Sequence, residues 1–247
     1  MNNVTESHVF ASIVIGGKQI PFITDAVVVS WLIVAFLIGA SILLTRRLKN
    51  IPGKGQNFVE IVVELISNIC RDTLGVHGKT FAPYIGAIFL FILTSNLAGI
   101  FNIAPQGGFF ANVLHIKALE NFRFEITPPT KNFNVVLCLT FMSVSVAFFC
   151  EFHYKGLRGW MRSFYRPMAI NGFIKILDYV VRPTSLCLRL FGNIIGGFIV
   201  IELIYHAFPP ALPAAAGIYF DLFDGALQAY IFVFLTMVYI KEASEEE

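Results

Sequence analysis

Three stretches of this chain are long, apolar and free of charged residues, and they restrict it to folds that place helices inside a lipid bilayer. They are residues 26–45, 81–101 and 135–150. A helix needs about 20 mostly apolar residues to cross the roughly 30 Å hydrocarbon core, and it satisfies its own backbone hydrogen bonds there. We therefore predict membrane spans at residues 26–45, 81–102 and 134–152.

The composition excludes several other classes of protein. Of 247 residues, 56% are hydrophobic and 14% are charged, whereas soluble domains have about 45–50% and about 25%. A net charge of +2 with no basic patch interleaved with aromatic residues argues against nucleic acid as a partner. The sequence has no nucleotide-binding, metal-binding or nucleophilic motif. We therefore expect no cofactor, no metal site and no catalytic residue in the chain itself.

Two further kinds of helix are predicted. Residues 56–76 carry apolar residues at helical spacing among charged ones, as in an amphipathic helix on a membrane surface. Residues 170–208 form one long apolar segment that, as a helix, is roughly 57 Å long at about 1.5 Å per residue. It must tilt steeply, break near Pro183 or run partly outside the bilayer core. A proline-dense link then leads to a last helix at 214–241, so the two form an antiparallel hairpin.

The basic residues of two loops predict the orientation of the chain. They are Arg46, Arg47, Lys49 and Lys54 after the first span, and Lys155, Arg158, Arg162 and Arg166 after the third. Loops rich in Lys and Arg face the cytoplasm, so segment 1–25 and loop 103–133 lie outside. The basic loop 153–168 and the C-terminus lie inside. The predicted fold is an all-α polytopic membrane protein with about five membrane segments.

Ionisable residues gather in the C-terminal hairpin: Lys175, Asp178, Arg182, Arg189, Glu202, Asp221 and Asp224, with His206 as a further proton carrier. Charge at membrane depth is costly and usually marks an ion pathway or an internal pair. On a continuous helix one face carries five polar residues, each within about 40° of the centre of that face: Asp178, Arg182, Ser185, Arg189 and Asn193. On the last helix one face carries Asp221, Asp224 and Gln228, and Tyr239 returns to that face.

Each of these residues has more than one interpretation. Lys175, Asp178 and Arg182 either belong to a pathway or simply lie at the cytoplasmic interface. Arg189 either pairs with an aspartate of the last helix or acts as a fixed positive barrier, since a guanidinium is not deprotonated in proteins. The glycines at 192, 196 and 197 allow another helix to approach closely.

Three titratable residues gather at the outer end of the hairpin. Glu202 and His206 lie one turn apart on the long helix, and Asp221 lies about two turns into the last helix, at the same end of the hairpin. Carboxylates and histidine can pass protons through water, so together they can line a hydrated acidic vestibule. For His206, an interfacial place beside the proline turn is the alternative.

The residues of the hairpin also resemble a known family. Residues 182–193, RPTSLCLRLFGN, resemble the (K/R)P-x-SL-x-x-RLFGN signature of subunit a of F-type ATP synthases. Four more segments resemble the family and stand in the family's order along the chain: GQNFVEIVVE, FNVVLCLTF, the turn at 155–157 and LQAYIFVFLTMVYI at 227–240.

This resemblance implies a non-catalytic, ion-translocating stator subunit beside a rotating ring of c subunits. Two aqueous half-channels load and unload H⁺, or alternatively Na⁺, on a ring carboxylate and so couple ion flow to rotation and ATP synthesis. Arg189 matches the family's essential arginine, and Asn193, Gln228 and Tyr239 match polar positions of its pathway. The implied partners are the c-ring, peripheral stalk subunit b and the rest of the complex. The implied location is the bacterial plasma (inner) membrane.

Two positions depart from the family pattern. Phe198 stands where many members have a glutamate, and Asp221 stands where many have a histidine. We therefore expect Asp221, with Glu202 and His206, to supply the outer half-channel instead.

Two other functions compete with this interpretation. In a secondary transporter Arg189 would bind an anionic substrate, but such folds carry internal repeats, and the sequence has none. A purely structural membrane subunit would explain the spans but not the charged face of the long helix.

Overall fold

The computed structural model of the chain describes residues 9–15, 18–46, 53–98, 128–163, 170–207, 212, 216–217 and 219–244. Side chains are not described for residues 9–23, 25, 157–163, 170–176, 198, 202, 205–207 and 221. Most of the predicted loop 103–133 and the end of loop 153–168 therefore lie outside the described residues. Within these residues the fold is almost entirely helical, and five helical segments are long and apolar enough to cross a membrane. The predicted helical, polytopic fold class is confirmed.

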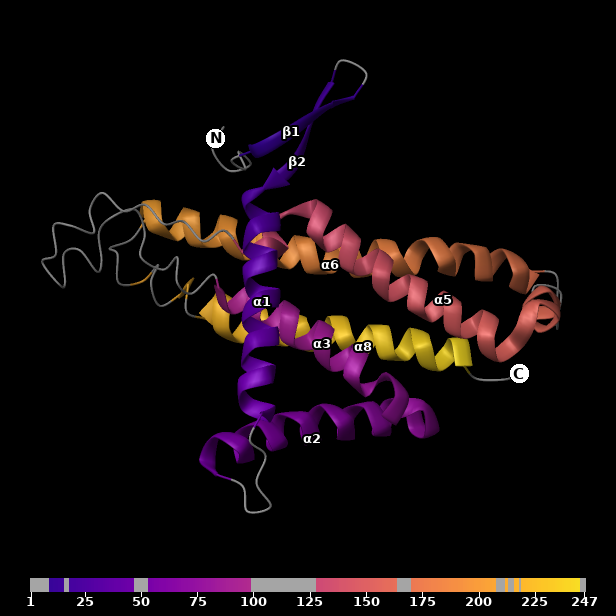
Figure 1. The fold of residues 1–247 in the computed structure, drawn as a ribbon. Coiled ribbons are helices and arrows are strands. Elements are labelled where there is room, and N and C mark those ends of the chain that lie inside the picture. Colours follow the sequence, from indigo (N-terminus) through magenta and orange to yellow (C-terminus); the bar gives the residue numbers. More distant parts are fainter. Residues whose placement is uncertain are drawn as a thin grey trace, which may run out of the picture.

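A small β-hairpin precedes the helices and was not predicted. Strand β1 (Val9–Ile15) pairs antiparallel with β2 (Lys18–Thr24), with Ile13 opposite Ile20. Both strands are rich in β-branched residues, which favour extended backbone. The hairpin leads directly into the first helix (Figure 1).

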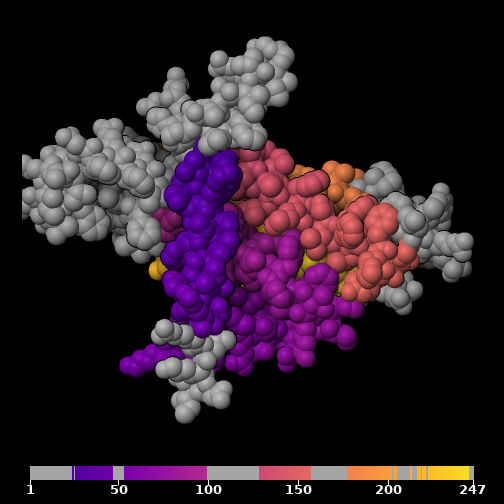
Figure 2. Space-filling model, in the orientation of Figure 1, coloured from indigo at the N-terminus to yellow at the C-terminus, as the bar shows by residue number. Residues whose placement is uncertain are grey.

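The first helix has little cover from the rest of the chain. Helix α1 (Asp25–Thr45) runs across the other helices rather than along them (Figure 1), and Figure 2 shows it as a column on the molecular surface. Trp31 is 74% exposed and Leu43 is 75% exposed. A helix that is apolar on all sides is stable only against lipid or another apolar protein.

The predicted amphipathic helix is α2 (Lys54–Leu74), which is joined to α3 (Gly78–Leu97) by the short 3₁₀ turn η1 (Gly75–His77). One face of α2 packs on α3 and buries Cys70 and Leu74. The opposite face exposes the apolar side chains of Phe58, Ile61 and Leu65, and the acidic Glu60 and Glu64 are exposed along its border. This mixture suits a helix at the boundary between lipid and water.

Helix α5 (Phe133–Ser163) follows the 3₁₀ turn η4 (Pro129–Lys131). At its start the side-chain Oδ1 of Asn132 accepts a hydrogen bond of 3.0 Å from the backbone N–H of Asn134, which caps the first turn. Gly156 interrupts the helix with φ of 63° and ψ of 166°, a backbone conformation that glycine adopts at little cost. The candidate membrane span therefore ends there, at Phe133–Gly156.

Helix α6 (Ile170–Ala207) is continuous over 38 residues, with Pro183 inside it. Of the alternatives considered from the sequence, a break at Pro183 is therefore wrong. Proline removes one helical hydrogen bond, and membrane helices tolerate this loss where neighbours or local adjustments compensate. The helix must tilt or extend beyond the bilayer core, and Figure 1 shows it lying along α5 and across α1.

The last helix is the centre of the fold. A π-helical segment, η5 (Tyr219–Asp224), leads into α8 (Gly225–Ser244), which packs against α2, α3, α5 and α6. Its inward side chains form the core together with those of α3, α5 and α6: Phe232, Met237, Ile240, Ile85, Ile92, Val136, Leu186 and Leu190. Helix α6 lies at the edge of this bundle, so one of its faces is left exposed by the described residues.

A close contact joins the start of α8 to the end of α3. The Asn96 side-chain Nδ2 donates a hydrogen bond of 2.9 Å to the backbone oxygen of Gly225. A Cβ atom at position 225 would lie only 2.9 Å from the Asn96 Cβ. The absence of a side chain at Gly225 therefore lets the two helices approach.

We predict that Gly225→Val destabilises the chain by about 1–3 kcal/mol, because the added side chain displaces Asn96. In heated, detergent-solubilised membranes, the temperature at which half of the chain aggregates falls by about 2–10 °C. The matched control is Gly39→Val on α1, where a Cβ meets nothing within 4 Å. Equal loss in both variants would contradict the importance of this contact.

Candidate functional site

The predicted polar residues of the long helix lie on one face. Because α6 is continuous, Asp178, Arg182, Ser185, Arg189 and Asn193 keep their helical spacing and share that face. Four of them are half-buried, whereas Arg189 is exposed. The face therefore presents one open guanidinium among partly covered polar groups.

Arg189 lies in the middle of a candidate membrane span. The span is Leu177–Ile201, with twelve residues before Arg189 and twelve after it. Arg189 forms no ion pair or hydrogen bond with any residue that the structure describes. The internal bridge to Asp224 that the sequence allowed is therefore not formed, and the side chain of Asp221 lies outside the described residues.

Two small residues follow this arginine on the same face. Gly192 and Gly196 are exposed, and a Cβ at either position would meet nothing within 4 Å. Gly197 points the other way, where a Cβ would lie 3.3 Å from the ring of Phe220 in η5. Gly197 therefore makes room for Phe220 of the same chain, whereas Gly192 and Gly196 leave space on the exposed surface of α6.

A charged cluster lies nearer the start of α6. Arg182 forms ion pairs with Asp178 on its own helix and with Glu242 on α8. The Arg182 Cζ atom lies 5.3 Å from the centre of the Tyr239 ring. Tyr239, which the sequence placed on the same face of the last helix as Gln228, therefore contacts this cluster. The side chain of Lys175 lies outside the described residues.

A second polar contact joins α5 to α6 beside this cluster. The Tyr179 hydroxyl donates a hydrogen bond of 2.5 Å to the Glu151 carboxylate, which is only 6% exposed. Neither Glu151 nor Glu242 was singled out as a site residue from the sequence. Glu151 falls near the end of the predicted span 134–152, and Glu242 directly follows the predicted last helix at 214–241, in the acidic sequence EASEEE.

Three buried polar residues lie at the other end of the hairpin: Gln228, which was predicted as a site residue, and Asn96 and Thr130, which were not. Gln228 is 4% exposed, and its Nε2 has no hydrogen-bond partner in the described part of the chain. One turn earlier, Gly225 accepts the hydrogen bond from Asn96, whose Oδ1 in turn accepts one of 2.9 Å from Thr130. Asn96 and Thr130 were missed, although Ser95 and Asn96 interrupt an otherwise apolar span.

The acidic residues expected at this end are only partly described. Asp224 is half-buried and closes the π-helical segment η5, a kind of irregularity that is frequent at functional sites. The backbones of Glu202 and His206 belong to α6 and that of Asp221 to η5. The side chains of these three residues lie outside the described part.

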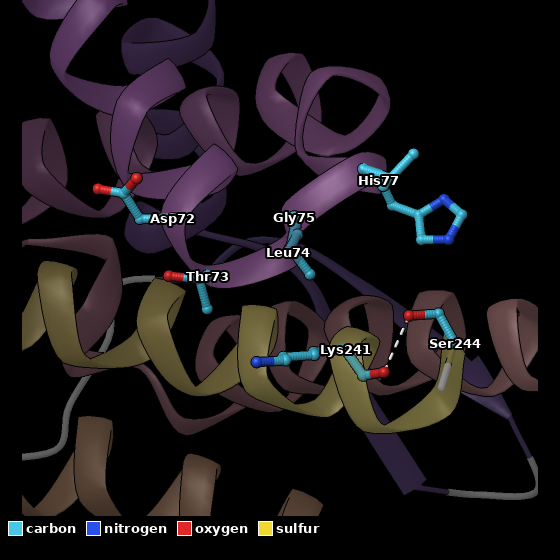
Figure 3. A pocket seen from close by; sticks show the side chains of 8 residues that line it. Asp72, Thr73, Leu74, Gly75, His77, Lys241 and Ser244 are labelled. Carbon is cyan, nitrogen blue, oxygen red and sulfur yellow. Dashed lines mark hydrogen bonds between the residues drawn. The ribbon is translucent and has the colours of Figure 1, made fainter. Parts of the chain in front are cut away.

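An open surface cleft lies elsewhere. It measures about 300 Å³ and lies between the turn after α2 and the end of α8. Figure 3 shows Lys241 and Ser244 opposite Leu74 and Gly75, and no predicted site residue lines the cleft. Within the described residues, no group of three or more His, Cys, Asp or Glu side chains could hold a metal.

Comparisons with known proteins agree on one family. The family described as "ATP synthase A chain" matches residues 27–241. "ATP synthase subunit a, sodium ion specific" of Propionigenium modestum is 31% identical over 223 residues, which cover 89% of this chain and 73% of that protein. "ATP synthase subunit a 3" of Pelobacter propionicus is 34% identical over 230 residues, which cover 90% and 88%. The chain therefore belongs to the ATP synthase A chain family.

Proposed function

We propose that this chain is the ion-translocating stator subunit of a rotary ATP synthase, in which Arg189 is both the barrier to ion leak and the partner of a ring carboxylate. The observation that carries the proposal is the open guanidinium at the centre of a membrane span. A permanent charge at that depth is costly unless an opposite charge meets it. The described part of the chain supplies none, and a carboxylate of a neighbouring subunit would meet this charge.

The surface beside Arg189 suits a second helix. Gly192 and Gly196 leave room for close approach on the same face, and small residues are the usual means by which membrane helices pack tightly. A ring of c-subunit helices, each with one carboxylate at mid-membrane, fits both the charge and the space. The electrostatic attraction is strong where water is largely excluded.

Two separate polar regions support two half-channels. The outer region contains Gln228, Asp224 and the Asn96–Thr130 pair, and the chain brings Glu202, His206 and Asp221 to the same end of the hairpin. The inner region follows the α6 face through Asp178, Arg182 and Ser185, with Asn193 beside Arg189. Buried polar atoms without protein partners, such as Gln228 Nε2, are costly in a dry interior, and a hydrated path relieves that cost.

The chain itself performs no covalent chemistry in this proposal. Its basic loops face the cytoplasm, its N-terminus lies outside and its C-terminus inside, in a bacterial inner membrane. Peripheral stalk subunit b and the rest of the complex are its further partners. The uncovered apolar surface of α1 is available to lipid or to another membrane subunit. A secondary transporter and a purely structural subunit are not the functions of the family to which the chain belongs.

The proposed coupling ion is H⁺, because Glu202, His206 and Asp221 can exchange protons with water. One relative carries the name "sodium ion specific", so Na⁺ is the alternative that the tests must separate. Both ions are therefore followed below, by quenching of a pH-sensitive dye and by uptake of radioactive sodium.

We predict that Arg189→Ala abolishes ATP-driven ion pumping in inverted membrane vesicles that carry the whole complex. The loss is about 100-fold or more, because a mid-membrane charge partner is worth several kcal/mol. Passive ion permeability of the vesicles rises at the same time, because the barrier is gone. Arg71→Ala, on the exposed side of α2, is the control and pumps normally. Persistent coupled pumping in Arg189→Ala would disprove the proposed role.

We predict that Asp221→Asn lowers ATP-driven pumping about tenfold or more, because the outer half-channel loses an ionisable group. Asp221→Glu, which keeps the carboxylate, retains part of the activity. Asp72→Asn, at an exposed position of α2, serves as the control. Pumping at the wild-type rate in Asp221→Asn would show that this residue is not part of the pathway. Sodium uptake without a pH gradient in the unaltered complex would show that the coupling ion is Na⁺ and not H⁺.

A further inference from the structure

Two arginines share the open face of α6, and a mechanism with one barrier must distinguish them. Arg182 and Arg189 are seven residues apart in a continuous helix. That spacing places them about 20° apart around the axis and about 10 Å apart along it. A carboxylate that passes along this face is attracted by both unless one is already neutralised.

The structure holds Arg182 from several sides. Its Nη2 lies 3.4 Å from Asp178 Oδ2 and also donates a short hydrogen bond to Glu242 Oε1. The ring of Tyr239 lies against the guanidinium, with the Cζ atom 5.3 Å from the ring centre. The Arg182 side chain is 24% exposed, so most of it is covered. These contacts direct its charge toward α8 and away from the open surface.

The main partner is itself fixed by a third helix. Glu242 lies near the end of α8, and its backbone oxygen accepts a hydrogen bond of 3.3 Å from the Lys155 ammonium of α5. A cation at a helix C-terminus also stabilises that end electrostatically. The carboxylate of Glu242 therefore reaches Arg182 from a helix end that α5 holds in place.

The two arginines thus differ in their partners. Arg182 has two carboxylates and an aromatic ring, whereas Arg189 has no ion pair with any described residue. Around Arg182 the two carboxylates of Asp178 and Glu242 outweigh the single positive charge. A passing anion is therefore drawn to Arg189, although Arg182 lies on the same face.

We propose that Glu242, assisted by Asp178, is a positioning residue that keeps Arg182 occupied, so that Arg189 is the only arginine of this face that a ring carboxylate can engage. The proposal rests on the function proposed above. A released Arg182 would hold the ring carboxylate at a second place, about two helical turns from the first, and so delay its movement. The ion pair between Arg182 and Glu242 thus prevents a second binding position for the ring carboxylate on this face.

The test compares Glu242→Gln with the double variant Arg182→Gln/Glu242→Gln in vesicles that carry the whole complex. The single variant weakens the hold on Arg182, so the rate of ATP-driven pumping falls by about threefold to fivefold, the size expected for a partly exposed charge pair. The double variant also removes the released cation and keeps the wild-type net charge of the cluster. Its pumping rate therefore rises above that of the single variant and recovers part of the loss, although Arg182 itself belongs to the inner polar region.

A merely structural bridge gives a different pattern, because the ion pair is absent from both variants. Equal slowing of the single and the double variant would overturn the proposal, as would an unchanged rate in Glu242→Gln. Asp178→Asn, with and without Arg182→Gln, provides the same comparison if Glu242→Gln accumulates poorly. Rates are normalised to the amount of the chain in the membrane.

The control is Glu60→Gln on α2, another exposed glutamate, which accepts a hydrogen bond of 2.7 Å from Gln56. It is expected to leave pumping unchanged. Failure of the proposed function is detected separately, since it would appear as coupled pumping in Arg189→Ala. If Glu242→Gln pumps normally while Arg189→Ala does not pump, only the role of Glu242 is disproved and the proposed function stands.

Discussion

The cost of a permanent charge in the middle of a lipid bilayer is the constraint on which the rest of this structure depends. A helix that carries Arg189 at the centre of its span cannot simply be buried in an apolar bundle, nor can it face lipid without a partner. The fold places α8 at the centre and α6 at the edge, with the arginine facing outward. The remaining helices supply the apolar packing that holds this arrangement, and the charge remains available to another subunit.

Much of the fold was predictable, because membrane spans follow from length and charge alone. The charge-free stretches became α1, α3 and α5, and the amphipathic pattern became α2. The N-terminal hairpin was missed, although two β-branched runs separated by two glycines at 16–17 are a recognised hairpin pattern. The continuity of α6 through Pro183 could not be predicted, because it depends on how neighbouring helices compensate for the lost hydrogen bond.

The site was predictable only in part, because motifs identify residues but not their partners. The signature around Arg189 and the polar residues of the last helix were visible in the sequence. The hydrogen bonds of Asn96 to Gly225 and Thr130 were not, since they join segments that are 129 and 34 residues apart. Glu242 resembled an ordinary residue of an acidic tail, and only the packing of α6 beside α8 brings it to Arg182.

The length of α6 has a mechanical consequence. At about 1.5 Å per residue its 38 residues extend for roughly 57 Å, and neighbouring helices in a bundle lie about 8–10 Å apart. A helix laid obliquely against a rotating cylinder of helices therefore faces several of them at once. Under the proposed function such contacts would share the load on the stator, and each helix of the rotor would be guided as it approaches the arginine and as it leaves it.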